Sequence, residues 1–487
     1  MSGSYDSLFM ILLNIFYILM QKSHLLCLFL TLSNPEIRKI HAWLSAPIHN
    51  KKEKLVVLFE WMCLEKKKKE ADRFAKEAAF KKLFPKEAYN DANLRILMFY
   101  LLKAIQNFLT YQEFTEQKLE NQIQLAAIYQ KRNLDKFFTQ SIKNIKEKQN
   151  SQPFRNTDFY QREFLIYKEE NTFLAKQSRS RPMSLQKIDD ALEVNFIIQK
   201  LAQSCLTVSH QNVYNADHNI GILPQVLAYV EQNNLLEIPA INLYYQGYKF
   251  LTEDQNGAYF ATFKKLIVEY QSIFPSSEIR ELYIMAINHC IQKVNQESES
   301  TYLEEIFSLY RLGIEKNFLL TNGIISRFSY RNIVSSGLKL QEFDWVSNFI
   351  HQYKKHLEKA VRESTFHYCL SRYHYETGDY LEAMKILQQD KYKDLISNLA
   401  AKTLLIKIYY EHQENNVLEY FLISFEAFIK RKKEIGYHKA NYLNIIRLMK
   451  KMLTLNPFDK KAKLKLQEEV KTTQPLSERV WFLEQLK

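Results

Sequence analysis

The chain has 487 residues, of which only nine are glycine and ten are proline, while 46% are hydrophobic. This composition excludes a turn-rich fold and a disordered chain, and it predicts a nearly all-α protein with a packed core. The formal net charge of +13 favours acidic partners, and five widely spread cysteines without a C-x-x-C pair indicate a reducing compartment.

The N-terminus begins with an apolar run, Leu8–Met20, which a second apolar run continues up to residue 32. Each run is shorter than the roughly 20 apolar residues of a membrane-spanning helix. Asp6 stands where a secretory signal carries positive charge. Three interpretations stay open: translation that begins at Met20 and makes residues 1–20 an extension, a buried helix, or a membrane anchor formed by residues 8–32. We expect a soluble, cytoplasmic protein.

Residues 21–150 predict an N-terminal helical bundle. Asn34 suits a helix cap and Pro35 the first helical position. Apolar residues then recur at helical spacing, and we expect the strongly apolar stretch Leu94–Phe114 to be central to this bundle. Polar residues near 150–153 indicate a linker after this bundle.

Helix pairs follow the bundle. Residues 151–275 predict a set of helical hairpins, and residues 276–487 predict a further array with a basic C-terminal segment. The expected pairs are separated by short polar breaks: 184–212 with 221–232, 237–252 with 257–273, and 276–296 with 301–316. A second polar stretch at 177–182 provides an alternative boundary between bundle and array.

The stretch Ser364–Gln389 predicts a helix, a tight turn at Gly378 and a second antiparallel helix. In the first helix, apolar residues recur at i, i+3, i+4 and i+7, which gives one buried stripe. Asp379 is placed to cap the second helix, and Glu382 three residues later can complete a capping box. Ala383 is small enough to let the two helices approach closely.

The same arrangement recurs on both sides of this hairpin. Gln341 takes the place of Gly378 at an offset of 37 residues, and Gln413 takes it at an offset of 35. Such periods are typical of stacked helical hairpins, and one hairpin cannot bury its apolar face alone. Residues 276–487 therefore predict a continuous array, and the aromatic tail, residues 475–487, can cap its end.

The hairpin around Gly378 resembles the tetratricopeptide repeat. It matches that family at small, aromatic and turn positions: Leu370, Ser371, Gly378, Asp379, Tyr380, Ala383 and Leu387. It departs from the family at His374 and Asp390, and it lacks the closing proline. The resemblance implies an α-solenoid of antiparallel helix hairpins. The whole chain is similar to uncharacterised bacterial helical-repeat proteins, which bring no assigned activity.

Partner binding in tetratricopeptide proteins uses the concave groove that the first helices build. The resemblance therefore nominates six positions for partner binding: Arg331, Tyr368, Arg372, Tyr375, Lys407 and Tyr410. Cationic and aromatic side chains together suit an acidic or extended peptide. The lysine–asparagine clamp of chaperone-binding members is not matched. The predicted function is a non-catalytic interaction scaffold for a protein or acidic peptide that the sequence does not identify.

Catalytic and cofactor motifs are excluded by spacing. The closest two glycines are ten residues apart, which excludes a P-loop and a dinucleotide fingerprint. The chain has neither a G-x-S-x-G nor an H-E-x-x-H motif. His367, Cys369 and His374 come nearest to a metal set, but Cys369 belongs to the apolar stripe. We therefore expect no catalytic residue, no cofactor and no bound metal.

Positive charge gathers between residues 430 and 471, where thirteen basic residues stand against four acidic ones. The core of this basic patch consists of two short runs: Lys430, Arg431, Lys432, Lys433, Lys450 and Lys451. Such a cluster attracts phosphates or an acidic surface, or it only solubilises the end of the array. Nucleic-acid association through residues 430–471 is therefore one alternative function, and a membrane-anchored scaffold held by residues 8–32 is another.

Overall fold

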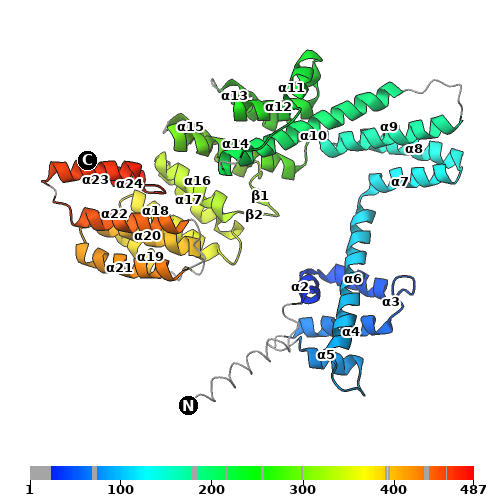
Figure 1. Ribbon diagram of the computed structural model, residues 1–487, viewed down its shortest axis with the longest axis horizontal. Helices are drawn as coiled ribbons and strands as arrows, with labels where there is room; N and C mark the ends of the chain where they lie inside the picture. The colour runs from blue at the N-terminus through cyan, green and yellow to red at the C-terminus, as the bar shows by residue number, and fades with distance from the viewer. Residues whose placement is uncertain are drawn as a thin grey trace. The chain divides into compact units, whose positions relative to one another are not determined.

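The computed structural model describes residues 23–68, 74–177, 185–214, 217–253, 257–297, 300–389, 392, 395–432, 438–456 and 458–487. These residues form helices joined by turns and loops, with one short two-stranded ribbon, which confirms the all-α prediction for the described chain (Figure 1). The predicted extension 1–20 and Lys433 lie outside the described residues. No helix in the described part is long and apolar enough to cross a membrane.

The chain divides into two compact units. Unit 1 comprises the residues up to Gln152 together with Arg162–Asp189, and unit 2 comprises Pro153–Gln161 together with Asp190–Lys487. Each unit has hydrophobic clusters composed only of its own residues. Burial of apolar surface therefore stabilises each unit internally.

The first part of unit 1 consists of helices that pack around α6. In chain order they are α2 (His24–Thr31), α3 (Asn34–Ser45), α4 (Glu53–Lys67), α5 (Lys76–Leu83) and α6 (Asp91–Glu116). Phe29 and Phe59 are fully buried in this core, with their rings edge to face 5.7 Å apart. The second apolar run thus forms helix α2, His24–Thr31, which buries Leu25, Leu26 and Phe29 and leaves Cys27 and Leu30 exposed.

The predicted cap of α3 is wrong by one residue. Ser33 is the N-cap: its hydroxyl accepts the Glu36 N–H, and the Glu36 carboxylate accepts the Ser33 N–H at 2.7 Å. A serine and a glutamate three residues apart form a complete capping box, which satisfies two backbone donors at once. Asn34 is therefore the first residue of the helix, and Pro35 follows it.

Three further helices follow in unit 1: α7 (Lys118–Lys131), α8 (Asp135–Asn150) and α9 (Thr157–Gln177), of which the residues up to Gln161 belong to unit 2. α7 and α8 pack as a hairpin. Lys146 and Glu170 pair at 2.6 Å and join α9 to α8, while Arg162 and Glu120 pair at 2.9 Å and join α9 to α7. The side chains of both ion pairs are partly buried, so dissolved salt screens their attraction less than at a fully exposed site.

Unit 2 is a succession of helices in which neighbours along the chain pack on each other. After residues 153–161 it continues from Asp190 within α10 (Leu185–Tyr214). The next elements are α11 (Leu223–Gln232), η2 (Leu235–Glu237), α12 (Pro239–Thr252), α13 (Ala258–Tyr270), α14 (Ser276–Glu297) and α15 (Ser300–Glu315). These bounds agree with the three predicted helix pairs to within a few residues. Packing of α12 on α13 and of α14 on α15 confirms two of the pairs.

The C-terminal part of unit 2 continues this succession. Its elements are α16 (Arg327–Lys339), α17 (Phe343–Tyr353), η3 (Lys354–His356), α18 (Arg362–Glu376), α19 (Tyr380–Gln389), α20 (Leu395–Glu411), α21 (Asn415–Arg431), α22 (His438–Leu453), α23 (Lys460–Thr472) and α24 (Arg479–Gln485). We call α16, α18 and α20 the first helices. Each packs on its own second helix, and α18 also packs on both other first helices.

One feature departs from a purely helical chain. β1 (Leu320–Thr321) and β2 (Ile324–Ile325) form a two-stranded antiparallel ribbon. Asn322 and Gly323, which connect the strands, have φ of 52° and 76°. Asn-Gly is the pair that adopts such a turn most easily, because it needs positive φ at both positions. This short hairpin signal was not recognised in the sequence.

The hairpins of the C-terminal array share one turn geometry. Gly378, Gln341 and Gln413 have φ of 83°, 60° and 59°, so all three are left-handed. The next N–H in each turn donates to a carbonyl in the last turn of the helix: Asp379 to His374 at 2.8 Å, Glu342 to Gly337 at 3.0 Å, and Glu414 to Tyr409 at 2.9 Å. This is the Schellman pattern that ends many helices. The predicted offsets of 37 and 35 residues are thus confirmed as positions of the same turn.

The predicted cap at the start of α19 is confirmed in part. The Asp379 carboxylate accepts the Glu382 N–H at 3.2 Å. The Glu382 carboxylate, which we expected to return the bond, pairs with Lys385 at 3.1 Å. Ala383 is fully buried, as are its counterparts Val346 and Leu418 in the neighbouring hairpins. The predicted contact position is therefore buried in all three hairpins.

Candidate functional site

The six nominated residues lie on the first helices and form a surface that we call the first-helix face. Arg331 lies on α16, Tyr368, Arg372 and Tyr375 lie on α18, and Lys407 and Tyr410 lie on α20. The Arg331 guanidinium carbon is 4.2 Å from the centre of the Tyr368 ring. Lys407 Nζ is 5.1 Å from the centre of the Tyr375 ring. The structure therefore brings cations and aromatic rings of successive helices into contact, an arrangement that attracts both electrostatically.

The face follows the register of the repeated turn. Ser335, Arg372 and Lys407 each stand six residues before the left-handed residue of their hairpin. The Arg372 guanidinium donates to Ser335 Oγ at 3.1 Å across α16 and α18, and it lies 3.5 Å from the Glu376 carboxylate. Equivalent positions of α16 and α18 therefore meet, as expected for side chains on one face of packed repeats.

A carboxylate that the sequence did not nominate joins this face. The Tyr375 hydroxyl donates to Glu411 Oε1 at 2.5 Å, and the Trp481 indole N–H donates to the same oxygen at 2.6 Å. Burial, together with the hydrogen bond to Glu411, raises the pKa of Tyr375. The phenol therefore stays protonated at neutral pH and acts as a donor.

The tail, residues 475–487, covers part of the first-helix face. Glu478 Oε2 lies 3.3 Å from Lys407 Nζ. The Trp481 ring meets Tyr410 edge to face at 5.7 Å, and Lys407 Nζ lies 5.5 Å from its centre. We expected the tail to pack on the end of the array, and the structure shows that its tryptophan reaches α20.

Sequence reasoning missed the acidic and tail components of this cluster, Glu411, Glu478 and Trp481. Glu478 and Lys407 are 71 residues apart in the chain. No spacing rule links two residues at such a separation, because the fold alone determines that they meet. A signal for Trp481 did exist, since a buried tryptophan usually finds a partner for its N–H.

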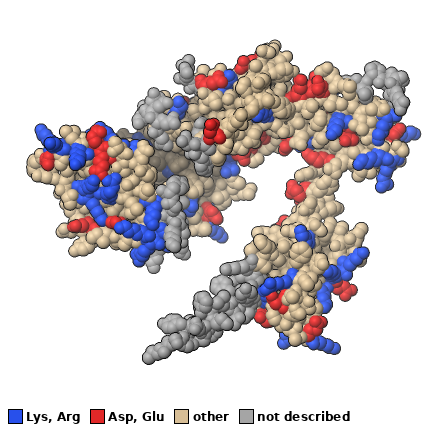
Figure 2. Space-filling model, viewed as in Figure 1, with Lys and Arg blue, Asp and Glu red and all other residues tan. Residues whose placement is uncertain are grey.

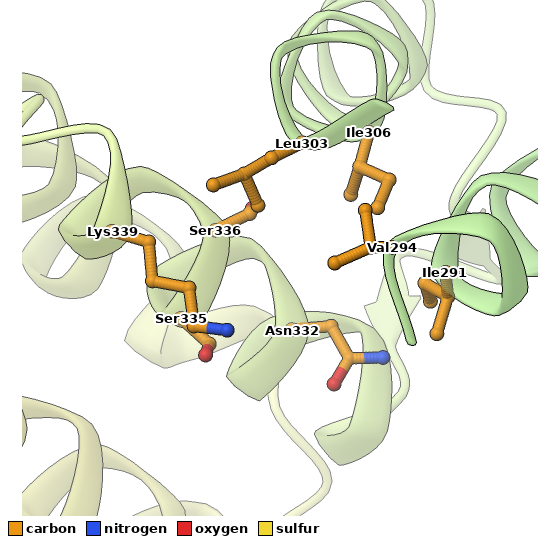
Figure 3. A pocket seen from close by; sticks show the side chains of 8 residues that line it. All are labelled: Ile291, Val294, Leu303, Ile306, Asn332, Ser335, Ser336 and Lys339. Carbon is orange, nitrogen blue, oxygen red and sulfur yellow. The ribbon is translucent and has the colours of Figure 1, made fainter. Parts of the chain in front are cut away.

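A small cavity of about 150 Å³ lies between α14, α15 and α16 (Figure 3). Ile291, Val294, Leu303 and Ile306 form an apolar wall, and Asn332, Ser335 and Lys339 bring polar groups from α16. Ser335 also accepts the hydrogen bond from Arg372. The cavity has room for a few water molecules and for no more than a small side chain.

The predicted basic patch is partly neutralised by the chain itself. Glu426 Oε1 lies 2.6 Å from Lys430 Nζ and Glu426 Oε2 lies 2.5 Å from Lys450 Nζ, so one carboxylate joins α21 to α22. Hydrogen bonds from Lys430 and Lys450 lower the pKa of Glu426 to about 2. Arg431 and Lys432 are exposed. Figure 2 shows Lys and Arg side chains interleaved with Asp and Glu over the C-terminal helices.

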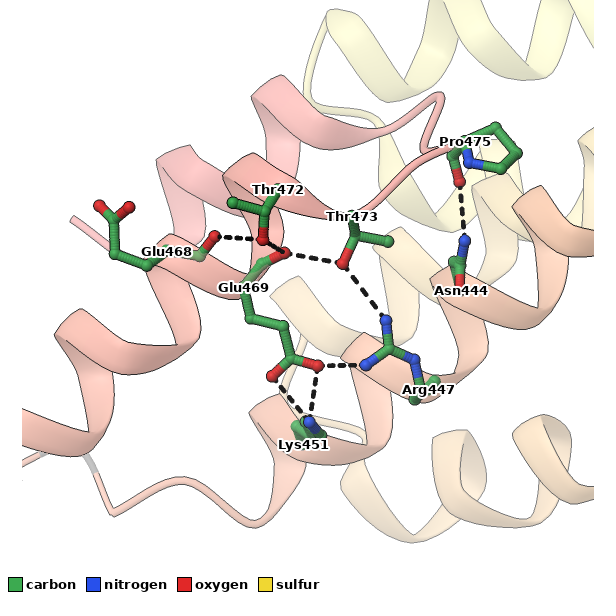
Figure 4. A network of polar contacts seen from close by, with 8 residues as sticks. All are labelled: Asn444, Arg447, Lys451, Glu468, Glu469, Thr472, Thr473 and Pro475. Carbon is green, nitrogen blue, oxygen red and sulfur yellow. Dashed lines mark hydrogen bonds and ion pairs between the residues drawn. The ribbon is translucent and has the colours of Figure 1, made fainter.

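A second carboxylate, that of Glu469, joins α23 to α22 and neutralises two more basic residues (Figure 4). Glu469 accepts from Arg447 and from Lys451, the latter at 2.6 Å. The hydrogen bond from Lys451 is the largest cause that lowers the pKa of Glu469. Asn444 donates to the Pro475 carbonyl at 3.0 Å. These contacts anchor α23 and the start of the tail to α22, while nucleic-acid binding by the patch stays a prediction.

A larger concavity, of about 820 Å³, lies among the start of α9, α10, α12 and α14. Glu278 lies at its edge and accepts hydrogen bonds from Tyr244 and, at 3.1 Å, from Asn156. Burial raises the pKa of the Glu278 carboxyl, although both hydrogen bonds act in the opposite direction. A second carboxylate, Glu281, lines the same concavity, and its charge also raises the pKa of Glu278.

Three residues considered as a metal set take separate partners. His367 lies 4.0 Å from Glu363, His374 lies 3.2 Å from Asp379, and Cys369 is buried in the core. Over the described chain, no group of three His, Cys, Asp or Glu side chains is placed to hold a metal ion. We take the first-helix face as the candidate site.

Comparison with known proteins found no relative: no family model, no curated protein and no solved structure matches the chain. The resemblance to the tetratricopeptide repeat therefore rests on the residues of the Gly378 hairpin. The recurring left-handed turn and the packing of successive hairpins agree with a helical repeat in general.

Proposed function

We propose that this protein is a non-catalytic interaction scaffold. In this proposal, the hairpins of unit 2 form a tetratricopeptide-like α-solenoid in the cytoplasm. The first-helix face forms its concave side and binds a protein partner through an acidic segment. Arginine and tyrosine contribute much of the binding energy at many protein interfaces, and this face carries both.

One observation carries the proposal. Cationic and aromatic side chains from three successive first helices contact one another, Arg331 with Tyr368 and Lys407 with Tyr375, and the face already holds carboxylates. Lys407 holds Glu478, and Tyr375 holds Glu411. A face that binds the carboxylates of its own chain has the donors to bind those of a partner, and charge-assisted hydrogen bonds are about twice as strong as neutral ones.

The proposal is tested by partner capture with charge-reversed chains. Arg331→Glu reverses a half-buried cation of the face that lies against Tyr368. We expect proteins that cross-link to the wild-type chain in its native cells to be lost from this variant. The measurement is quantitative mass spectrometry of the cross-linked proteins.

The matched control is Lys385→Glu on the second helix α19. Lys385 is exposed and pairs with Glu382 three residues away, and such surface pairs contribute little stability. The control must retain the partner. Equal recovery of the same proteins by all three chains would reject the proposal. Recovery of nucleic acid that falls steeply with salt would favour residues 430–471 as the binding segment.

A further inference from the structure

The tail packs between two surfaces of unit 2. On one side, Gln467 of α23 donates to the Leu486 carbonyl at 2.6 Å, and Phe482 and Leu486 are buried in the core. On the other side, Glu478 and Trp481 contact the first-helix face through Lys407 and Glu411. The tail is therefore attached to α23 and presents two different side chains to α20.

Glu478 and Trp481 of the tail have the charge and the ring that the cationic and aromatic residues of the first-helix face bind. Glu478 supplies the anion that Lys407 pairs with, and its charge also acts on the Arg372 guanidinium. Trp481 supplies a ring for Tyr410 and an N–H donor for Glu411. Glu478 is the N-cap of α24 and Trp481 lies three residues later, so both point to the same side of one helical turn.

We propose that the first-helix face recognises a helical segment in which a carboxylate precedes a tryptophan by three residues. The tail occupies the face as an intramolecular example of that ligand, and a partner with the same pair of side chains replaces it there. This inference rests on the proposed function and names the chemistry of the partner. Charge and ring complementarity support this inference, because Glu478 pairs with Lys407 and the Trp481 ring contacts the Tyr410 ring.

Tethering sets how strongly a partner must bind. A ligand on the same chain competes at an effective concentration on the order of millimolar. A free segment of equal affinity therefore binds only weakly while the tail is in place. Weakening the tail's own contacts removes the competitor and exposes the face, so the same free segment then binds more tightly.

A labelled synthetic peptide of residues 475–487 is the probe, added to the full-length chain and followed by fluorescence anisotropy. In the chain variant Glu478→Gln with Trp481→Ala, we expect the peptide to bind at least about tenfold more tightly than in wild type, because the competitor is lost. A peptide that carries the same two substitutions must not bind. Val480→Ala is the matched chain control, since Val480 is 70% exposed in the same helix turn.

A second variant keeps the test decisive if the loss of buried Trp481 disturbs folding. Glu478→Gln alone retains the tryptophan and removes only the charge that pairs with Lys407, so it must also raise peptide affinity. Adding Lys407→Glu to either variant must abolish the gain. Equal peptide affinity for wild type and a folded Glu478→Gln chain overturns the inference.

The remaining outcomes separate the two proposals. A wild-type dimer that dissociates on Trp481→Ala, measured by sedimentation, identifies a second copy as the occupant and overturns the inference of a different partner. Peptide binding with the expected variant pattern supports recognition of the Glu–Trp pair. If Arg331→Glu then loses no cellular partner, the proposed function fails while the recognition chemistry stands.

Discussion

At the scale of single residues, the repeated turns share one backbone conformation although their side chains differ. Gly378 adopts positive φ at little cost, whereas Gln341 and Gln413 adopt it with a Cβ atom. An L residue in the left-handed region costs roughly 1 kcal/mol relative to glycine. The offsets of 37 and 35 residues predicted these three turn positions correctly, although two of them carry glutamine in place of glycine.

The cost at these turns gives a first prediction. Gln413→Gly should raise the free energy of unfolding by about 0.5–1 kcal/mol, because glycine relieves the left-handed strain. Gly378→Ala should lower it by about 1 kcal/mol for the same reason, since a Cβ there meets no neighbouring atom. Urea denaturation of both variants checks the signs. Two changes in the same direction would contradict this account.

The carboxylate of Glu426 gives a prediction about pH. Its folded pKa of about 2 lies below its ordinary value of 4.5, so its contribution to stability is present above pH 4.5 and is lost as the pH falls toward 2. Glu426→Gln should therefore destabilise the chain at pH 7 by at most about 1 kcal/mol, as for surface pairs. The difference from wild type should shrink between pH 4.5 and pH 2.5.

Thermal unfolding over that pH range measures the effect. Glu419→Gln is the control, because Glu419 is exposed on the same helix, α21. Its difference from wild type should stay small throughout. A Glu426→Gln difference that grows as the pH falls would show that the lysines do not stabilise the ionised carboxylate.

At the scale of elements, Gly337 lets α16 approach its neighbours. A Cβ at this position would lie 2.4 Å from Val346 Cγ2 on α17 and 2.9 Å from Phe307 on α15. We therefore expect Gly337→Ala to destabilise unit 2 by about 1–3 kcal/mol through overpacking. The measurement is the free energy of unfolding from denaturant titration.

A double variant separates overpacking from a general effect on the helix. Val346→Ala creates space at the point of collision, so Gly337→Ala combined with Val346→Ala should recover part of the loss caused by Gly337→Ala. Residues in contact show such non-additivity. Strict additivity of the two substitutions would mean that the close approach of α16 and α17 does not limit stability.

At the scale of the whole molecule, the separate cores of the two units predict separate responses. Leu418 is fully buried in α21, and Leu418→Ala should destabilise unit 2 by about 2–5 kcal/mol. Amide hydrogen exchange should accelerate in α20–α22, which surround this site, and stay unchanged in α6 of unit 1. Faster exchange in α6 would show that the two units unfold together.

Much of the fold follows from local signals in the sequence. Scarce glycine and proline predicted helices, and helical spacing placed the pairs from α12 to α15. The ribbon at Asn322 and the cap at Ser33 were missed because each depends on two or three residues within a long helical pattern. Position in the repeat nominated the six residues of the first-helix face. Their acidic neighbours could not be found this way, since Glu478 reaches Lys407 only through the folding of α21–α24.

The indole of Trp481 is an optical reporter of the state of the tail. It is buried and hydrogen-bonded to Glu411, while the chain's three other tryptophans, Trp43, Trp61 and Trp345, lie on helices distant in sequence. Release of α24 would transfer this one ring to water and shift its emission to longer wavelength. A chain in which the other three are replaced by phenylalanine would thus signal occupancy of its own binding surface in real time, without any attached dye.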